Sequence, residues 1–114
     1  MAINNFYSAP VPSTVNIANG ATASAAIDLT DSVLAGIHFP TITSTAVSFQ
    51  AASTAGGTYR AVRKNGADYS EVIATDKYLI LNPADFWGVQ YLKIVMGSAE
   101  GASRDLVISV VKRV

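Results

Sequence analysis

The sequence predicts an all-β protein, a single antiparallel β-sandwich that is jelly-roll-like and has about seven to nine short strands. Three observations lead to this prediction. Apolar and polar residues alternate from Ser24 onward, as they do in half-buried strands. Turn signals built from Gly, Pro, Asn and Asp recur at intervals of roughly ten residues. The 18 Ala, 11 Ser and 9 Thr are scattered among Val, Ile and aromatic residues and form no helical stripe.

Residues 1–23 are predicted to form an extended N-terminal arm, and residues 24–114 the sandwich domain. The arm has no charged side chain, and Pro10 and Pro12 favour extended backbone. Its large apolar groups are isolated along the segment, at Ile3, Phe6, Tyr7 and Val11. Because these groups are too few to collapse on themselves, we expect them to contact neighbouring subunits.

The first strands follow from short alternating runs. Residues 15–17 are expected to add an edge strand, followed by a turn at Asn19-Gly20. Residues 24–29 and 33–39 each alternate, and Pro40 ends the second run. The second run is expected to place Val33, Ala35, Ile37 and Phe39 on one face and Leu34, Gly36 and His38 on the other.

The middle of the chain predicts tight hairpins. Gly56-Gly57 can supply the positive φ angles of one hairpin turn, and Asn65-Gly66 is the signal for a second. A third turn is expected at residues 75–77. The strands between these turns are 46–52, 58–62, 69–74 and 78–81.

Residues 82–88 predict one helical turn. Its signals are Asn82 as N-cap, Pro83 at the first helical position, Asp85 in the first turn and Gly88 as a left-handed stop. A capped turn of this kind folds its aromatic residues onto the end of a sandwich, so we expect Trp87 to plug the core there.

Two strands complete the sequence. Residues 91–96 alternate, and a Gly-Ser-Ala loop follows them. Residues 105–113 carry apolar side chains on both faces, so this strand is expected to lie between two neighbours.

Charge is sparse and unevenly distributed. Only 14% of the residues are charged and the formal net charge is zero, so the basic footprint of a nucleic-acid binder is missing. Asp28 and Asp31 are the only charged residues among residues 1–59. Since exposed surfaces normally carry more charge, we expect part of the surface formed by these residues to be covered by something other than water. No signal-like start and no apolar run of about 20 residues are present, so no membrane association is expected.

No residue pattern predicts catalysis. His38 is the single possible base for a serine triad, and it lies mid-strand in a buried-looking segment without a nucleophile elbow. One His and no Cys exclude an ordinary zinc site, and no acidic run has EF-hand spacing. Nothing pairs Glu71 with Glu100 for glycoside hydrolysis. We therefore expect no enzyme activity, no cofactor and no metal.

Two surface features leave alternatives open. The aromatic residues near Trp87 could stack on sugars, which would make the protein a glycan-binding module. Arg60, Arg63 and Lys64 cluster on one hairpin. A solvated sheet edge explains this cluster, and a salt bridge to a partner protein is the alternative.

Four segments carry a family resemblance. AAIDLTDSVLAGIHFP, AVSFQAASTAGGTYRAV, YLILNPADFWGVQYLKIVMG and RDLVISVVKRV resemble small virion structural proteins of tailed bacteriophages and prophages. The resemblance covers about residues 24–111 and leaves the arm outside. Its motifs are structural, and they lie at Ile27-Asp28-Leu29, Gly36-Ile37 to Pro40, Phe49-Gln50-Ala51 to Tyr59 and Leu81 to Lys93.

The resemblance implies a capsid decoration or cement protein of the virion, assembled in the bacterial host cytoplasm. Such a protein forms homo-oligomers and stabilises the head by binding major capsid subunits or other virion proteins. A neck, tail or fibre-attachment component is the alternative within this class, and a carbohydrate-binding module is the alternative outside it. Partner contacts are expected at Ile3, Phe6, Tyr7, Val11, Arg60 and Arg63.

Overall fold

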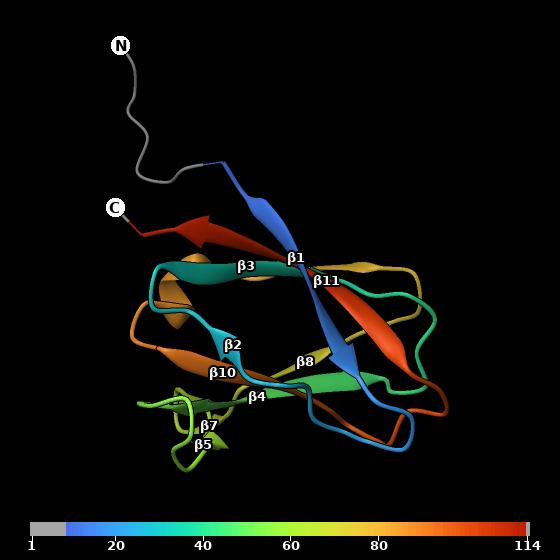
Figure 1. Ribbon diagram of the computed structural model, residues 1–114. Helices are drawn as coiled ribbons and strands as arrows, with labels where there is room; N and C mark the ends of the chain where they lie inside the picture. Colours follow the sequence, from blue (N-terminus) through green and yellow to red (C-terminus); the bar gives the residue numbers. More distant parts are fainter. Residues whose placement is uncertain (1–8, 114) are drawn as a thin grey trace.

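Two antiparallel sheets lie face to face in the computed structural model, which describes residues 9–113 (Figure 1). Sheet A has the strand order β1-β11-β3-β9. Its strands are β1 (Val11–Ile17), β11 (Arg104–Lys112), β3 (Ser32–His38) and β9 (Tyr78–Ile80). Sheet B contains β2 (Ile27–Asp28), β10 (Tyr91–Met96), β4 (Ala46–Ala52), β5 (Arg60–Ala61) and β8 (Ser70–Val72). A small hairpin joins β6 (Arg63–Lys64) to β7 (Ala67–Asp68).

The pairing of the strands is nested, which confirms the jelly-roll-like prediction. Antiparallel pairs join β1 to β11, β2 to β10, β3 to β9 and β4 to β8. The chain therefore follows the course of one long hairpin. From its ends to its tip, successive strand pairs lie alternately in sheet A and sheet B. The tip of this hairpin, between β4 and β8, contains β5, β6 and β7. Residues 9–113 form eleven strands, more than the number expected, because the tip is divided into short pairs.

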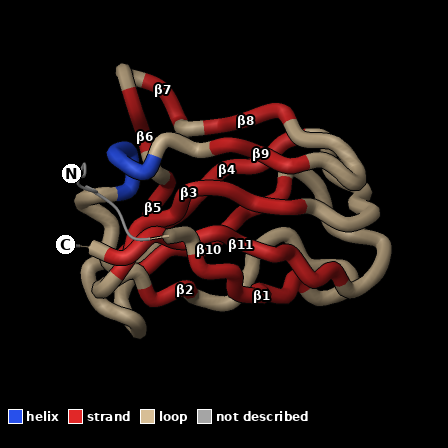
Figure 2. Tube along the Cα trace, turned by 90° about the horizontal axis from the view of Figure 1, so that it is seen from above, coloured by secondary structure: helices blue, strands red, loops and turns tan. Residues whose placement is uncertain are grey.

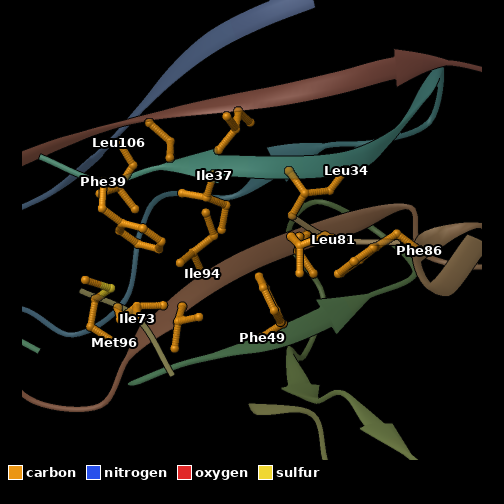
Figure 3. Packing of buried hydrophobic residues seen from close by; sticks show 14 of the residues in the cluster. Leu34, Ile37, Phe39, Phe49, Ile73, Leu81, Phe86, Ile94, Met96 and Leu106 are labelled. Carbon is orange, nitrogen blue, oxygen red and sulfur yellow. The ribbon is translucent and has the colours of Figure 1, made fainter. Parts of the chain in front are cut away.

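The core is a single apolar layer between the sheets (Figure 3). Leu34, Ile37 and Leu106 of sheet A point toward Phe49 and Ile94 of sheet B, and all five are buried. At one end, the rings of Phe49 and Phe86 meet edge to face with centroids 5.3 Å apart, a favourable aromatic geometry. Alternation in the strands explains the layer, because every second side chain of a strand points to the same face.

The predicted helical turn is the 3-10 helix η1 (Pro83–Phe86). The Ala84 N–H donates to the Asn82 side chain over 3.1 Å, as expected for an N-cap. Gly88 does not adopt the predicted left-handed conformation, since among glycines of the described chain only Gly20 and Gly66 have positive φ. The Trp87 prediction is also wrong: Phe86 is fully buried and plugs the core, while Trp87 is 49% exposed.

Part of the predicted arm belongs to the sandwich. Residues Val11–Ile17 pair with β11 along their whole length, and Val15 and Ile17 are buried in the core. The expected edge strand at residues 15–17 is therefore confirmed, and it begins four residues earlier than expected, at Val11. Pro12 is tolerated because β1 lies at the edge of sheet A, where a missing N–H breaks no ladder. Residues 1–8 lie outside the described chain, and with them the predicted contacts at Ile3, Phe6 and Tyr7.

A β-bulge changes the predicted faces of β3 at Leu34, while Ile37 and Phe39 are buried and His38 is exposed, as the alternation predicts. Ser109 pairs with Gly36 and Val110 with Leu34, so Ala35 has no partner on β11. The extra residue shifts the alternation, and both Leu34 and Ile37 point into the core.

Of the two predicted hairpin turns, one is confirmed. Asn65 and Gly66 have φ angles of 57° and 83°, as a two-residue hairpin turn requires. The turn at Gly56-Gly57 is different, because neither glycine has a positive φ. Gly57 lies close to Thr54 instead: a Cβ atom at position 57 would lie 2.6 Å from Thr54 Oγ1.

The different burial of two adjacent aromatic residues gives a stability prediction. Phe86→Ala leaves a cavity in the core and is expected to lower the free energy of unfolding by about 3–5 kcal/mol. Trp87→Ala, the matched control, removes a half-exposed ring and is expected to cost about 1 kcal/mol. Urea unfolding of both variants measures the difference. Equal losses would show that Trp87 is part of the core.

Candidate functional site

The outer face of sheet A is the first candidate surface. Two rows of paired residues cross all four of its strands. One row is Thr14, Val107, His38 and Tyr78, and the other is Pro12, Ser109, Gly36 and Ile80. We call these eight residues the A face. They include no Asp, Glu, Lys or Arg, whereas exposed surfaces normally carry about a quarter to a third charged residues.

Tyr78 covers the centre of the A face. Its hydroxyl is 2.7 Å from Ser109 Oγ, and its ring crosses Gly36 on the way. A Cβ atom at position 36 would lie 2.6 Å from the Tyr78 ring, so glycine allows the ring to lie in this position. Val107 and Ile80 are exposed apolar groups of the A face, at 37% and 83% exposure.

His38 belongs to the A face and is exposed, which corrects the expectation of a buried histidine. It is the last residue of β3, and its side chain points away from the core because its neighbour Ile37 points inward. Its ring centroid lies 6.0 Å from that of Tyr78. Within residues 9–113, no group of three or more His, Asp or Glu side chains could hold a metal ion.

A second candidate surface is the edge groove between β8 and β9. Seen from above in Figure 2, these strands run along the same edge of the sandwich, β9 in sheet A and β8 in sheet B. A hollow of about 170 Å³ is lined by Phe39, Val72, Ile73, Ala74, Lys77, Tyr78 and Leu79. A larger one of about 420 Å³ is lined by Lys64, Asn65, Asp68, Tyr69, Ser70, Glu71, Ile80, Asn82 and Asp85. Together they follow both strands, with an apolar end and a polar end.

Both strands of the edge groove have unpaired backbone groups. Phe39 N–H donates to the Lys77 carbonyl and Leu81 N–H to the Ala35 carbonyl, so these alternate residues of the β9 segment face β3. Leu79 has the same phase and also faces β3, whereas Tyr78 and Ile80, which alternate with these residues, direct their N–H and C=O groups to the opposite side. Edge strands are normally protected by charge, Pro or a bulge. The exposed side chain of Ile80 provides no such protection.

The polar end of the edge groove is organised around Asp85. Lys64 Nζ lies 2.9 Å from Asp85 Oδ1, and the Tyr69 hydroxyl donates to Asp85 Oδ2 over 3.4 Å. Burial raises the pKa of Tyr69 to about 12, helped by the negative charges of Asp85 and Glu71 and by this hydrogen bond. Tyr69 therefore remains a neutral donor at physiological pH.

The predicted partner contacts that can be placed lie on different sheets. Val11 is half-exposed at the start of β1, while Arg60 lies in β5 and Arg63 in β6. Arg63 pairs with Asp68 of the same hairpin at 3.7 Å and donates to the Gly66 carbonyl. The hairpin thus uses Arg63 internally, in line with a solvated sheet edge.

Trp87 borders a third surface hollow, of about 370 Å³, with Thr30, Gly88, Gln90 and Arg113. The Arg113 guanidinium stacks on the indole ring at 4.9 Å. It also donates to the carbonyls of Leu29, Phe86, Trp87 and Val89. Arg113 therefore fixes the end of η1 against β11, a role that its position near the end of the printed sequence does not indicate.

Glu100 is a buried charge, although the sequence places it in a loop of small residues. Its carboxylate accepts hydrogen bonds from Thr43 N–H, from Ser44 N–H and Oγ, and from Arg104 Nε. Burial alone raises the pKa of the Glu100 carboxyl, but these hydrogen bonds together lower it below its ordinary value of 4.5. The sequence signal was the spacing of Glu100 and Arg104, an opposite-charge pair four residues apart in an otherwise uncharged loop.

Comparison of the chain with protein families, curated proteins and solved structures gives no match. No helix among residues 9–113 has the length and apolarity needed to cross a membrane.

The Glu100 carboxylate gives a pH prediction. Since its folded pKa lies below the unfolded one, its contribution to stability is complete above about pH 4.5 and is lost as the pH falls through the folded pKa. Glu100→Gln is expected to lower the free energy of unfolding near neutral pH by about 3–5 kcal/mol, because Arg104 loses its buried partner. The loss should shrink in acid.

Denaturant unfolding of the wild type and the variant between neutral and acidic pH measures this difference. Glu71→Gln is the control, since Glu71 is the other glutamate and is only half-buried. It is expected to change stability by about 0.5 kcal/mol or less. A pH-independent effect of Glu100→Gln would contradict the role given to the charge.

Proposed function

We propose that the protein is a non-enzymatic structural subunit of a bacteriophage virion, a capsid decoration protein that forms oligomers and binds major capsid subunits. The observation that carries this proposal is the A face. Its two rows hold no Asp, Glu, Lys or Arg across all four strands of sheet A. A partner protein can cover such a face without removing a formal charge from water, the most costly step in forming an interface.

The distribution of apolar and polar residues on the A face supports the same role. Val107, Tyr78 and Ile80 are 37%, 53% and 83% exposed, and small or polar residues lie between them on the A face. Asn16 and Asp105 form the next row and give the face a polar border. An apolar centre with a polar rim is typical of protein interfaces.

Two further lines of support are analogies. The jelly-roll arrangement is used by viral capsid proteins and by lectins. The sequence motifs resemble those of small virion proteins, and these motifs lie on β2, β3, β4 and β10. Because one fold serves many functions, the site carries the proposal and the fold only supports it.

The number of copies in purified particles tests the proposal. A decoration protein is expected at close to the abundance of the major capsid protein, measured by quantitative mass spectrometry. A few copies per particle would favour the alternative, a neck, tail or fibre-attachment component. Complete absence from particles would overturn the virion assignment.

A charge placed in the A face is expected to weaken particle binding. Thr14→Glu puts an unpaired carboxylate in one of the two rows and should reduce affinity by about tenfold or more, roughly 1.4 kcal/mol. Gln50→Glu is the matched control, because Gln50 lies on the outer face of sheet B opposite Lys93. Co-sedimentation with particles that lack the protein measures binding. Equal effects of the two changes would exclude the A face as the contact.

Glycan binding is the second candidate function, and the exposure of Trp87 favours it. An indole ring that is 49% exposed beside Thr30 and Gln90 offers both a stacking surface and hydrogen-bonding groups. Arg113 already occupies a position over this ring, which reduces the surface available to a sugar. If sugars bind here, Trp87→Ala should abolish retention on a glycan array while the fold, followed by circular dichroism, is unchanged. No retention by the wild type would remove this candidate.

A further inference from the structure

The edge groove has the properties of a site for one added β-strand. Tyr78 and Ile80 direct backbone donors and acceptors away from β3, at the two-residue spacing of an antiparallel or parallel ladder. On β8, Ile73 N–H donates to the Thr45 carbonyl, so the groups of Val72 likewise face away from β4. Exposed apolar side chains at both positions, Val72 at 85% and Ile80 at 83%, border the opening.

The apolar end of the edge groove fits an aromatic ring. Its volume is about 170 Å³ and Phe39, Ile73 and Leu79 contribute to its lining. For scale, an engineered apolar cavity of about 150 Å³ admits benzene. A strand that adds to β9 turns alternate side chains toward this hollow and toward the A face.

From these features we propose that the edge groove binds residues 1–8 of a second copy of this chain as an added strand. This segment, MAINNFYS, is uncharged and contains no Pro, so every one of its residues except the first can donate a peptide N–H to a ladder. Phe6 enters the apolar hollow. Ile3 and Tyr7, which share the opposite face of an extended segment, lie beside Ile80 and Tyr78.

The geometry of sheet A requires the donor to be a second copy. β1 lies at one edge of the sheet and β9 at the other, so a strand added to β9 is four strand spacings from β1, roughly 19 Å. The chain from Val11 back to Phe6 spans at most about 18 Å when fully extended. It would also have to turn and run along β9, so Phe6 and Tyr7 cannot occupy the groove of their own chain.

This inference deepens the proposed function and rests on it for the expectation that the protein forms oligomers. Exchange of residues 1–8 would link copies through backbone hydrogen bonds and leave the A face free for the capsid. The two surfaces therefore have different partners, and they can be tested separately.

Cysteine cross-linking between two variants of the full chain tests the exchange, since the protein has no Cys of its own. Phe6→Cys is mixed with Val72→Cys and oxidised. The mixed disulfide is expected to form about tenfold or more faster than that between Phe6→Cys and Trp87→Cys, an exposed position at a different hollow. Equal rates for the two mixtures, or no mixed product, would overturn the proposal.

Two further measurements complete the test. The double variant Phe6→Cys/Val72→Cys should give cross-linked dimers and larger species, and a disulfide closed within one monomer would overturn the requirement for a second copy. The wild type is expected to sediment as an oligomer, and the Phe6→Asp variant is expected to have a lower sedimentation coefficient than the wild type. Equal sedimentation coefficients would contradict the exchange. Particle binding is measured in parallel. Cross-linking without particle binding would support the exchange and reject the virion role. Particle binding without cross-linking would support the virion role and reject the exchange.

Discussion

The apolar layer between the two sheets is the constraint on which the rest of the structure depends. The two main sheets are separate ladders, and the backbone hydrogen bonds within each sheet do not hold it against the other. Their contact comes from side chains such as Leu34, Ile37 and Phe49, which meet across the layer (Figure 3). Hydrophobic burial is proportional to the area removed from water, so each strand must present its apolar face inward at the same time. The bulge on β3 serves this requirement, because it turns both Leu34 and Ile37 into the layer.

Charged groups close the sandwich where the apolar layer ends. Glu100 gathers the backbone N–H groups of Thr43 and Ser44 and the guanidinium of Arg104 around one buried carboxylate. Arg113 does the converse, collecting around one cation the carbonyl oxygens of Leu29, just after β2, and of Phe86 in η1. Loops supply these groups, and their backbone would otherwise be left without partners beside the core. The Glu100 carboxylate thus provides acceptors for backbone N–H groups, and the Arg113 guanidinium provides donors for backbone carbonyls.

Two surfaces of the sandwich, the edge at β8 and β9 and the A face, remain uncovered in the single chain. A jelly roll leaves edges, and at the edge formed by β8 and β9 the exposed positions Val72 and Ile80 are apolar, although Glu71 and Lys77 lie nearby. The A face adds a sheet surface without formal charge. Both features are costly for a protein that remains alone in water and useful for one that is covered by other subunits. The proposed roles in virion assembly and strand exchange follow from this contrast.

The sequence by itself determined the features that depend on local geometry. Alternation of side chains located β4 and β10 with their bounds, Asn65-Gly66 gave a true hairpin turn, and Asn82 capped η1. The uncharged N-terminal segment was also visible in composition alone. These features follow from backbone dihedrals and side-chain direction within a few residues.

Only the tertiary structure decided the features that depend on distant neighbours. It placed Phe86 in the core and Trp87 outside, recruited Val15 and Ile17 from the predicted arm, and surrounded Glu100 with donors from another loop. The A face and the edge groove likewise exist only once strands far apart in the chain are paired. Register and packing are settled by the whole set of contacts at once, and no local pattern in the sequence encodes them.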